Sequence, residues 1–201
     1  LHRDAAMVTP DGMPLVWLLR HSGYHEANRV CGPDLMPALF HQSQSRGYRH
    51  FLYGSSETTL SLLQHSLDRK YPDARIVGRY SPPFRTLTDD EESEVDRIVN
   101  AADPDIVWVS LGAPKQDRWM AAHRHALKAP VLIGVGAAFD MLAGRVKRAP
   151  GFLQRTGCEW MFRVAQEPRR LTKRYFESNS RFAAMVIGEK LGLTRHHADL
   201  Q

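Results

Sequence analysis

The sequence predicts an α/β fold, with a Rossmann-like, mostly parallel sheet flanked by helices and a C-terminal helical appendage. Strand-like apolar runs alternate with helix-like segments at short spacing, and no strand-like run follows Pro150. Beyond that point only helical patterns continue. We therefore expect an α/β core over residues 1–149, a basic helical appendage over 150–193 and a tail over 194–201.

Four strands are expected in the core. Each is a run rich in β-branched or aromatic residues that stops at Gly, Ser or Pro, as the buried strands of parallel sheets do. The four runs are RHFLYG (49–54), ARIVGRY (74–80), DIVWVSLG (105–112) and VLIGVG (131–136).

Helices are expected between these strands. Ser55 or Ser56 can cap a helix that follows the first strand, because a serine side chain accepts a hydrogen bond from the first free N–H groups. Thr88 and Glu91 have the spacing of a capping box, which predicts a second helix. Residues 114–127 form the expected helix between the last two strands.

The basic residues concentrate in the appendage, which we expect to be broken near Gly157 and at Pro168. Ten Lys and Arg, against three Glu, lie between Arg145 and Arg181, although the whole chain carries a net charge of only +5. Aromatic rings interleave with them. This mixture fits a membrane interface or single-stranded nucleic acid. The alternative is a solvated helical face whose rings pack on the core.

The composition limits where the protein works. Its two cysteines, Cys31 and Cys158, fit neither a metal-binding spacing nor a disulfide framework, which indicates a reducing compartment. The sequence has no apolar run near the roughly 18 residues of a membrane span, and no visible signal peptide. We therefore expect a cytoplasmic protein.

The carboxyl ends of the strands are the expected ligand site, as in other parallel α/β sheets. Small residues there let a ligand approach, and helix starts attract anions. The alternative is a set of ordinary strand–helix turns. The absence of GxGxxG and Walker lysine motifs argues against a dinucleotide or P-loop site. The candidate residues are Gly54, Ser55, Gly112, Lys115, Gln116, Gly136 and Asp140.

No metal site is expected from the acidic residues. The run from Asp89 to Glu92 falls in a predicted first helical turn, where carboxylates complement the helix dipole. Near the start of the chain, Asp11 precedes Gly12 in a turn. Such an aspartate is either a turn former or a general base at the mouth of the site.

Five longer motifs occur in a fixed order: PDGMPLVW, YSPPFRTLTDDE, SLGAPKQDRWM, GVGAAFD and RAPGFLQRTGCEWMFRVAQEPRRLTKRY. Together they resemble the WecG/TagA/CpsF family of bacterial glycosyltransferases, over about residues 7–185. The resemblance implies inverting transfer of a hexose from a UDP-sugar to a sugar on a polyprenyl-diphosphate carrier, without metal or cofactor. The family makes cell-surface polysaccharides, including teichoic-acid linkage units, at the cytoplasmic membrane face. Its hexoses include N-acetylmannosamine, its uronic acid and glucose.

The resemblance also implies roles for individual residues. The candidate catalytic residues are Asp11, Arg29 and Gln116. Asp11 matches the general base that deprotonates the acceptor hydroxyl, and Arg29 matches a motif arginine near it. Gln116 matches a glutamine facing the cleft, and Asp140 matches a position that contacts the nucleotide. The remaining candidate substrate-binding residues are Thr9, Arg148 and the appendage arginines Arg163, Arg170 and Arg174, which match groups that stabilise the diphosphate.

Two departures from the family pattern stand out. Asp117 replaces a family glutamate and is one methylene shorter. The family also has a few dozen residues, including a first strand, before its Asp-Gly motif, whereas Leu1 lies only ten residues ahead of Asp11. We therefore expect either a fragment or processed form, or a sheet without that edge strand.

The expected partners are the UDP-sugar, the polyprenyl-diphosphate-linked saccharide and the cytoplasmic membrane surface, to which the protein would be peripheral. Two alternatives stay open: a non-catalytic module that binds UDP-sugar or lipid diphosphate, and a nucleic-acid-binding protein. We expect no nucleic acid partner. The oligomeric state is open, a homo-oligomer included.

Overall fold

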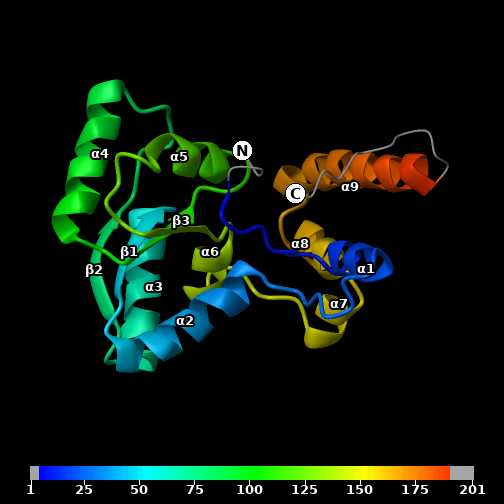
Figure 1. The fold of residues 1–201 in the computed structure, drawn as a ribbon, viewed down its shortest axis with the longest axis horizontal. Helices are drawn as coiled ribbons and strands as arrows, with labels where there is room; N and C mark the ends of the chain where they lie inside the picture. The colour runs from blue at the N-terminus through cyan, green and yellow to red at the C-terminus, as the bar shows by residue number, and fades with distance from the viewer. Residues whose placement is uncertain (1–4, 191–201) are drawn as a thin grey trace. The chain divides into compact units, whose positions relative to one another are not determined.

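The structure, a computed structural model, describes residues 5–190 (Figure 1). The chain divides into two compact units, residues 1–148 and 149–201. Among the helices in the described range, none has the length and apolarity needed to cross a membrane.

A four-stranded parallel sheet forms the centre of the first unit. Its strands are β1 (Arg49–Gly54), β2 (Arg75–Tyr80), β3 (Ile106–Ser110) and β4 (Val131–Gly134), in the spatial order β2-β1-β3-β4. The two central strands are buried almost throughout, as expected where helices cover both faces. The predicted α/β class with a parallel sheet is confirmed, and so are all four strands.

Helices cover both faces of this sheet, as Figure 1 shows. Because successive strand residues point to opposite faces, Leu52 and Trp108 pack with α2 (Gly32–Arg46), α3 (Glu57–Lys70) and α6 (Ala138–Leu142). Their neighbours Tyr53 and Val109 pack instead with α4 (Asp89–Ala102) and α5 (Lys115–His123). The result is a three-layer arrangement in which every strand leads to the same edge.

The predicted caps are present. The side chain of Ser56 accepts a hydrogen bond from the Thr59 N–H at 3.2 Å, so Ser56 is the N-cap of α3. Thr88 and Glu91 form the reciprocal bonds of a capping box at the start of α4. Two forked hydrogen bonds from Arg85 to Glu91 also hold the β2–α4 loop on this helix, and lower the pKa of Glu91 to about 2.

Three helices of the first unit were not expected from the sequence. These are α1 (Met13–His21), α2 and the short α6. The first has an unbroken apolar run without a helical stripe, and α2 contains Pro37 in its interior. Conversely, α5 ends at His123, four residues earlier than predicted, and a single turn follows it, closed by bonds from the Ala126 and Leu127 N–H groups to the His123 carbonyl.

The second unit is helical over its described part. It contains α7 (Gly151–Arg155), α8 (Glu159–Gln166) and α9 (Pro168–Lys190). The breaks fall at the two predicted places, with Gly157 at a φ of 71° and Pro168 opening α9. Within this unit the rings of Trp160 and Tyr175 lie with their centroids 6.0 Å apart.

At the amino edge of the sheet, Arg49 holds the aspartates of the turn before β3. Its guanidinium bonds to both oxygens of Asp105 at 3.2 Å, and to Asp103, while its own N–H bonds to Asp105 at 2.7 Å. The guanidinium lowers the pKa of Asp105. These acids therefore stabilise the edge opposite the expected ligand site.

A buried histidine lies between the sheet and α2. Nδ1 of His50 accepts a hydrogen bond from Trp108 Nε1 at 3.0 Å, so its proton is on Nε2, which donates to Ser43 Oγ at 2.8 Å. Ser43 donates in turn to the Leu39 carbonyl at 2.6 Å. Complete burial lowers the pKa of His50 from 6.5 to about 4. The folded protein therefore holds this ring neutral.

We expect His50 to make stability fall with acid. Between its unfolded and folded pKa values only the unfolded chain takes up the proton, so the free energy of unfolding decreases as pH falls through this range. From pH 7.5 to pH 5 this linkage amounts to about 2 kcal/mol. Urea titrations at both pH values should show that His50→Gln, which keeps donor and acceptor, loses less stability than the wild type. An equal loss in the two proteins would contradict the assignment.

Candidate functional site

Hydrogen bonds join the carboxyl ends of the central strands. At the end of β1, Gly54 and Ser55 adopt positive φ values of 114° and 59°. A Cβ on Gly54 would lie 2.5 Å from the Ser110 carbonyl oxygen, which instead accepts the Ser55 N–H at 3.1 Å. A non-glycine residue in this left-handed region costs about 1 kcal/mol. The edge therefore holds Ser55 in a turn that an isolated chain would avoid.

Hydrogen bonds made by Ser110 and Gln116 connect the carboxyl end of β3 and the first turn of α5 to the turn after β4. Gln116 Oε1 accepts the Gly136 N–H at 3.0 Å, and Ser110 Oγ donates to the Gly136 carbonyl at 2.6 Å. Gln116 is 9% exposed, and a Cβ on Gly134 would lie 2.8 Å from its amide nitrogen. The structure thus buries this predicted cleft residue, and its side-chain amide joins the first turn of α5 to the turn after β4.

Other residues of this edge face open space. Gly112 and Gly136 have positive φ values of 75° and 56°, and a Cβ built on either would meet no atom within 4 Å. Lys115 is exposed in the first turn of α5. The backbone of the two glycine turns and the ammonium group of Lys115 are therefore both accessible to a ligand at the carboxyl ends of β3 and β4.

A second group, which we call the hydroxyl cluster, consists of Ser56, Thr59, Asp140 and Arg145. Arg145 Nη1 donates to Thr59 Oγ1 at 2.8 Å and to Ser56 Oγ at 3.2 Å, and Thr59 Oγ1 donates to Asp140 at 3.4 Å. The backbone N–H of Arg145 also bonds to the Asp140 carbonyl at 2.9 Å. A guanidinium, a carboxylate and two hydroxyls thus gather at the start of α3.

A third group lies before α1 and α2. Arg29 Nε donates to the backbone carbonyl of Asp11 at 2.6 Å, and the Val30 N–H donates to the Pro10 carbonyl at 3.1 Å. Thr9 Oγ1 donates to the Val30 carbonyl at 3.3 Å. The structure therefore brings together three predicted residues, Thr9, Asp11 and Arg29, from two segments 18 or more residues apart. Asp11 itself is exposed.

Arg148 joins this third group through a forked ion pair. Its two terminal nitrogens bond to the two oxygens of Asp34 at 2.5 and 2.6 Å, and one also lies 3.6 Å from the Cys31 sulfur. These bonds lower the pKa of Asp34. Burial raises the pKa of the Cys31 thiol to about 12, aided by its hydrogen bond to Asp34 and by the charge of Asp11. Cys31 is therefore a neutral hydrogen-bond donor. Together with the preceding segment, these residues form the base cluster: Thr9, Asp11, Arg29, Cys31, Asp34 and Arg148.

Two connections place the base cluster beside the strand edge. A Cβ on Gly32 would lie 2.5 Å from the Val135 carbonyl oxygen and 3.1 Å from the Ala138 Cβ, so the start of α2 rests on the turn after β4. In addition, the segment after α6 carries Arg145 to the hydroxyl cluster and, three residues later, Arg148 to Asp34. The two clusters thus border one edge of the first unit.

The predicted site residues fall into two sets. Most belong to the edge turns, the hydroxyl cluster or the base cluster of the first unit. Arg163 lies on α8 and Arg170 and Arg174 lie on α9, in the second unit, and the side chains of Arg170 and Arg174 are outside the described residues.

The structure adds Cys31, Asp34 and Thr59, which the sequence did not single out as ligand-site candidates. It also gives partners to Arg145, which the sequence placed only among the basic residues near the appendage. The hydrogen bonds that unite them cross 81 to 117 residues of sequence.

The arrangement suits an anionic ligand rich in hydroxyl groups. Open glycine turns admit a ligand, helix starts and arginines favour phosphate, and Asp140 and Thr59 offer partners to hydroxyl groups. Asp11 adds an exposed carboxylate that can accept a proton. Within residues 5–190, no group of three or more His, Cys, Asp or Glu side chains could hold a metal ion.

Comparison with known proteins identifies the family of this chain. The model of the glycosyl transferase WecG/TagA/CpsF family matches residues 1–196. A Bacillus spizizenii protein, named N-acetylglucosaminyldiphosphoundecaprenol N-acetyl-beta-D-mannosaminyltransferase, is 32% identical over 167 residues, which cover 83% of this chain and 63% of that protein. Proteins with the same name are 31% identical in Bacillus subtilis strain 168, over 91% of this chain and 69% of theirs, and 25% identical in Staphylococcus aureus strain MW2, over 85% and 65%.

The family resemblance seen in the motifs is thus confirmed over nearly the whole sequence. The chain spans somewhat less than two thirds of the length of the Bacillus spizizenii and Staphylococcus aureus relatives that it matches. The chain belongs to the WecG/TagA/CpsF family of glycosyltransferases.

Proposed function

We propose that this protein is an inverting, metal-independent hexosyltransferase. It moves a sugar from a UDP-sugar donor to a saccharide on a polyprenyl-diphosphate carrier, at the cytoplasmic face of the membrane, during synthesis of a cell-surface polymer. The observation that carries this proposal is that the base cluster and the hydroxyl cluster border one edge of the sheet. The names of the relatives favour N-acetylmannosamine as the sugar and an N-acetylglucosamine diphosphate lipid as the acceptor.

The donor nucleotide fits the strand edge. In this proposal the diphosphate lies over the turns at Gly112 and Gly136, near Lys115, where backbone and cation are accessible together. The ribose and base approach the hydroxyl cluster, whose carboxylate Asp140 accepts hydrogen bonds from hydroxyl groups. Arg145 is already oriented by Ser56 and Thr59, so its guanidinium loses little freedom when it meets a phosphate.

Asp11 is the general base of the proposed reaction. Its carboxylate removes the proton from the acceptor hydroxyl while the hydroxyl oxygen attacks the anomeric carbon from the face opposite UDP. The bond from that carbon to the β-phosphate oxygen breaks, and its electron pair leaves with UDP, so the configuration inverts. Arg29 donates a hydrogen bond to the backbone carbonyl of Asp11 and so fixes the position of the backbone from which the Asp11 side chain extends.

The negative charge that develops on the departing UDP must be stabilised. Preorganised cations and helix starts stabilise such charge most effectively when they are already fixed before the reaction. Arg145 supplies one fixed guanidinium, and Arg163, Arg170 and Arg174 of the second unit are proposed to bind the donor or carrier diphosphate. The second unit's basic excess, noted from the sequence, supports this role.

The role of Asp11 is tested by Asp11→Asn. Loss of the proton acceptor should lower kcat about 10²- to 10⁴-fold. The affinity for UDP should stay within about twofold, because the proposal puts Asp11 on the acceptor side. The assay follows UDP release from UDP-N-acetylmannosamine with a lipid-linked N-acetylglucosamine diphosphate acceptor.

Asp73→Asn is the matched control for this assay, because Asp73 is an exposed aspartate just before β2, at the other end of the strands. Full turnover by Asp11→Asn would disprove the assignment. A wild-type protein that binds UDP but turns over no such sugar would favour the non-catalytic binding module.

Nucleotide binding is tested by calorimetry with UDP in excess chelator, with ADP and GDP for comparison. Selective binding of UDP is expected, and Arg145→Ala should weaken it about tenfold, the value of one charge-assisted hydrogen bond. Arg124→Ala is the control, since Arg124 is an exposed arginine at the far end of α5. Equal affinity in the two variants would remove Arg145 from the donor site.

A further inference from the structure

Helix α1 is unusually apolar for a helix that is mostly exposed. Its nine residues include seven successive apolar ones, Met13 to Leu19, yet Val16 alone of the nine is buried. Leu15 is 41% exposed and Trp17 is 48% exposed. A helix that is apolar on all sides normally lies inside a protein or against another apolar phase, and an exposed apolar surface of this kind marks an interaction site.

Helix α1 itself carries no acidic residue, and its basic residues, Arg20 and His21, lie in its last turn. Arg20 donates to the Ala27 carbonyl at 2.9 Å and to Asn28 at 3.1 Å, which fixes the following loop against the helix. An apolar helix with a cationic end complements a lipid surface that carries anionic headgroups.

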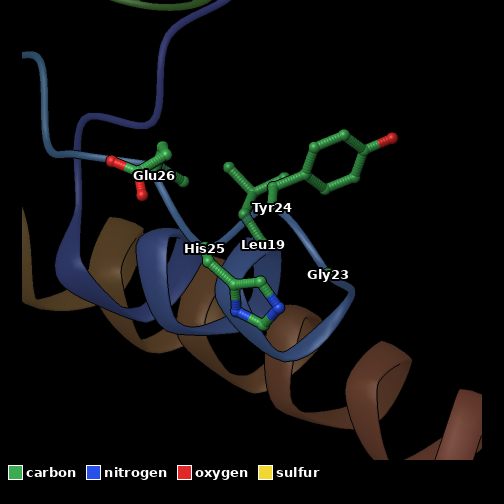
Figure 2. Close-up of a pocket in the computed structure, with 6 residues that line it drawn as sticks. Leu19, Gly23, Tyr24, His25 and Glu26 are labelled. Atoms are coloured by element: carbon green, nitrogen blue, oxygen red, sulfur yellow. The ribbon is translucent and has the colours of Figure 1, made fainter.

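The loop after α1 extends the apolar surface. A pocket of about 510 Å³ lies at the C-terminal end of the helix, lined by Leu19, Gly23, Tyr24, His25, Glu26 and Ala27. Figure 2 shows the phenol ring of Tyr24 pointing away from the helix, and Tyr24 is 53% exposed. Trp and Tyr side chains of this kind favour the boundary between headgroups and acyl chains.

We propose that α1 is a docking surface for an anionic lipid bilayer. Leu15, Trp17 and Tyr24 enter the interface, and the cationic end of the helix meets the headgroups. The helix begins two residues after Asp11, with Gly12 as its N-cap. Docking through α1 therefore holds the general base next to the membrane surface, where a lipid-linked acceptor presents its sugar. This last step rests on the proposed function; the docking itself does not.

Binding to vesicles tests the surface directly. Leu15→Glu should weaken binding to phosphatidylglycerol-containing vesicles at least about tenfold. It removes an apolar side chain from the interface and adds a negative charge that the anionic headgroups repel. Leu62→Glu is the matched control, since Leu62 on α3 is a leucine exposed to a similar degree, 45%. Its vesicle affinity should stay within about twofold of the wild type.

Fluorescence shows whether α1 itself touches lipid. In a Trp160→Phe background, Trp17 is the exposed tryptophan, because Trp108 and Trp119 are buried. Vesicles with brominated acyl chains should quench its emission, and the same vesicles without bromine should shift the emission to the blue. Binding without quenching of Trp17 would overturn the proposal, and so would equal vesicle affinity in the Leu15→Glu and Leu62→Glu proteins.

A second copy of the chain is the other candidate occupant of this surface. Self-association that Leu15→Glu abolishes, in a protein that does not bind vesicles, would overturn the proposal in favour of that contact. UDP titration of the same variants separates the two proposals. Loss of vesicle binding with unchanged UDP affinity concerns docking alone, whereas a wild-type protein that binds vesicles but not UDP contradicts the proposed function alone.

Discussion

The candidate site depends on the close packing of Gly32 against the turn after β4. No side chain fits between them, because even a Cβ would approach the Val135 carbonyl oxygen to 2.5 Å. This contact brings the start of α2 onto the carboxyl edge of the sheet. The segment before it carries Arg29, which holds Asp11, and the first turn of α2 carries Asp34, which holds Arg148. This packing, together with the segment that carries Arg145 and Arg148, fixes the base cluster relative to the strand ends.

The proposed division of labour follows from this geometry. Ser110 and Gln116 satisfy buried polar groups through hydrogen bonds to the turn after β4. The backbone at Gly112 and Gly136 stays open to a ligand. Arg145 and Arg148 leave one short segment in two directions, and each is held by partners before any ligand arrives. Such preorganisation suits a reaction in which a diphosphate leaves and a proton is removed at neighbouring positions. The apolar α1, which begins beside Asp11, gives the same region an affinity for lipid in our proposal.

Local sequence signals predict much of the fold, but they predict little of the geometry of the site. The β-branched runs and the Thr88–Glu91 capping box are encoded within a few residues, so the strands and α4 followed from them. Helix α1 escaped prediction because its apolar run has no stripe, and α2 because Pro37 lies within it. The fork between Arg148 and Asp34 spans 114 residues, a pairing that no spacing rule contains. Gln116 could likewise be identified as a candidate from its motif, whereas the hydrogen bond that its side chain accepts from the Gly136 N–H could not be predicted.

Hydrogen exchange measured by mass spectrometry, with and without a saturating UDP-sugar, would locate the donor site on the sheet. We expect slower exchange in peptides that cover the strand-end turns and the segment around Arg145, with the amino ends of the strands near Arg49 and Asp105 unchanged. Slower exchange confined to the amino edge, or to the surface of α4, in a protein that binds the sugar nucleotide would contradict a site at the carboxyl ends of the strands.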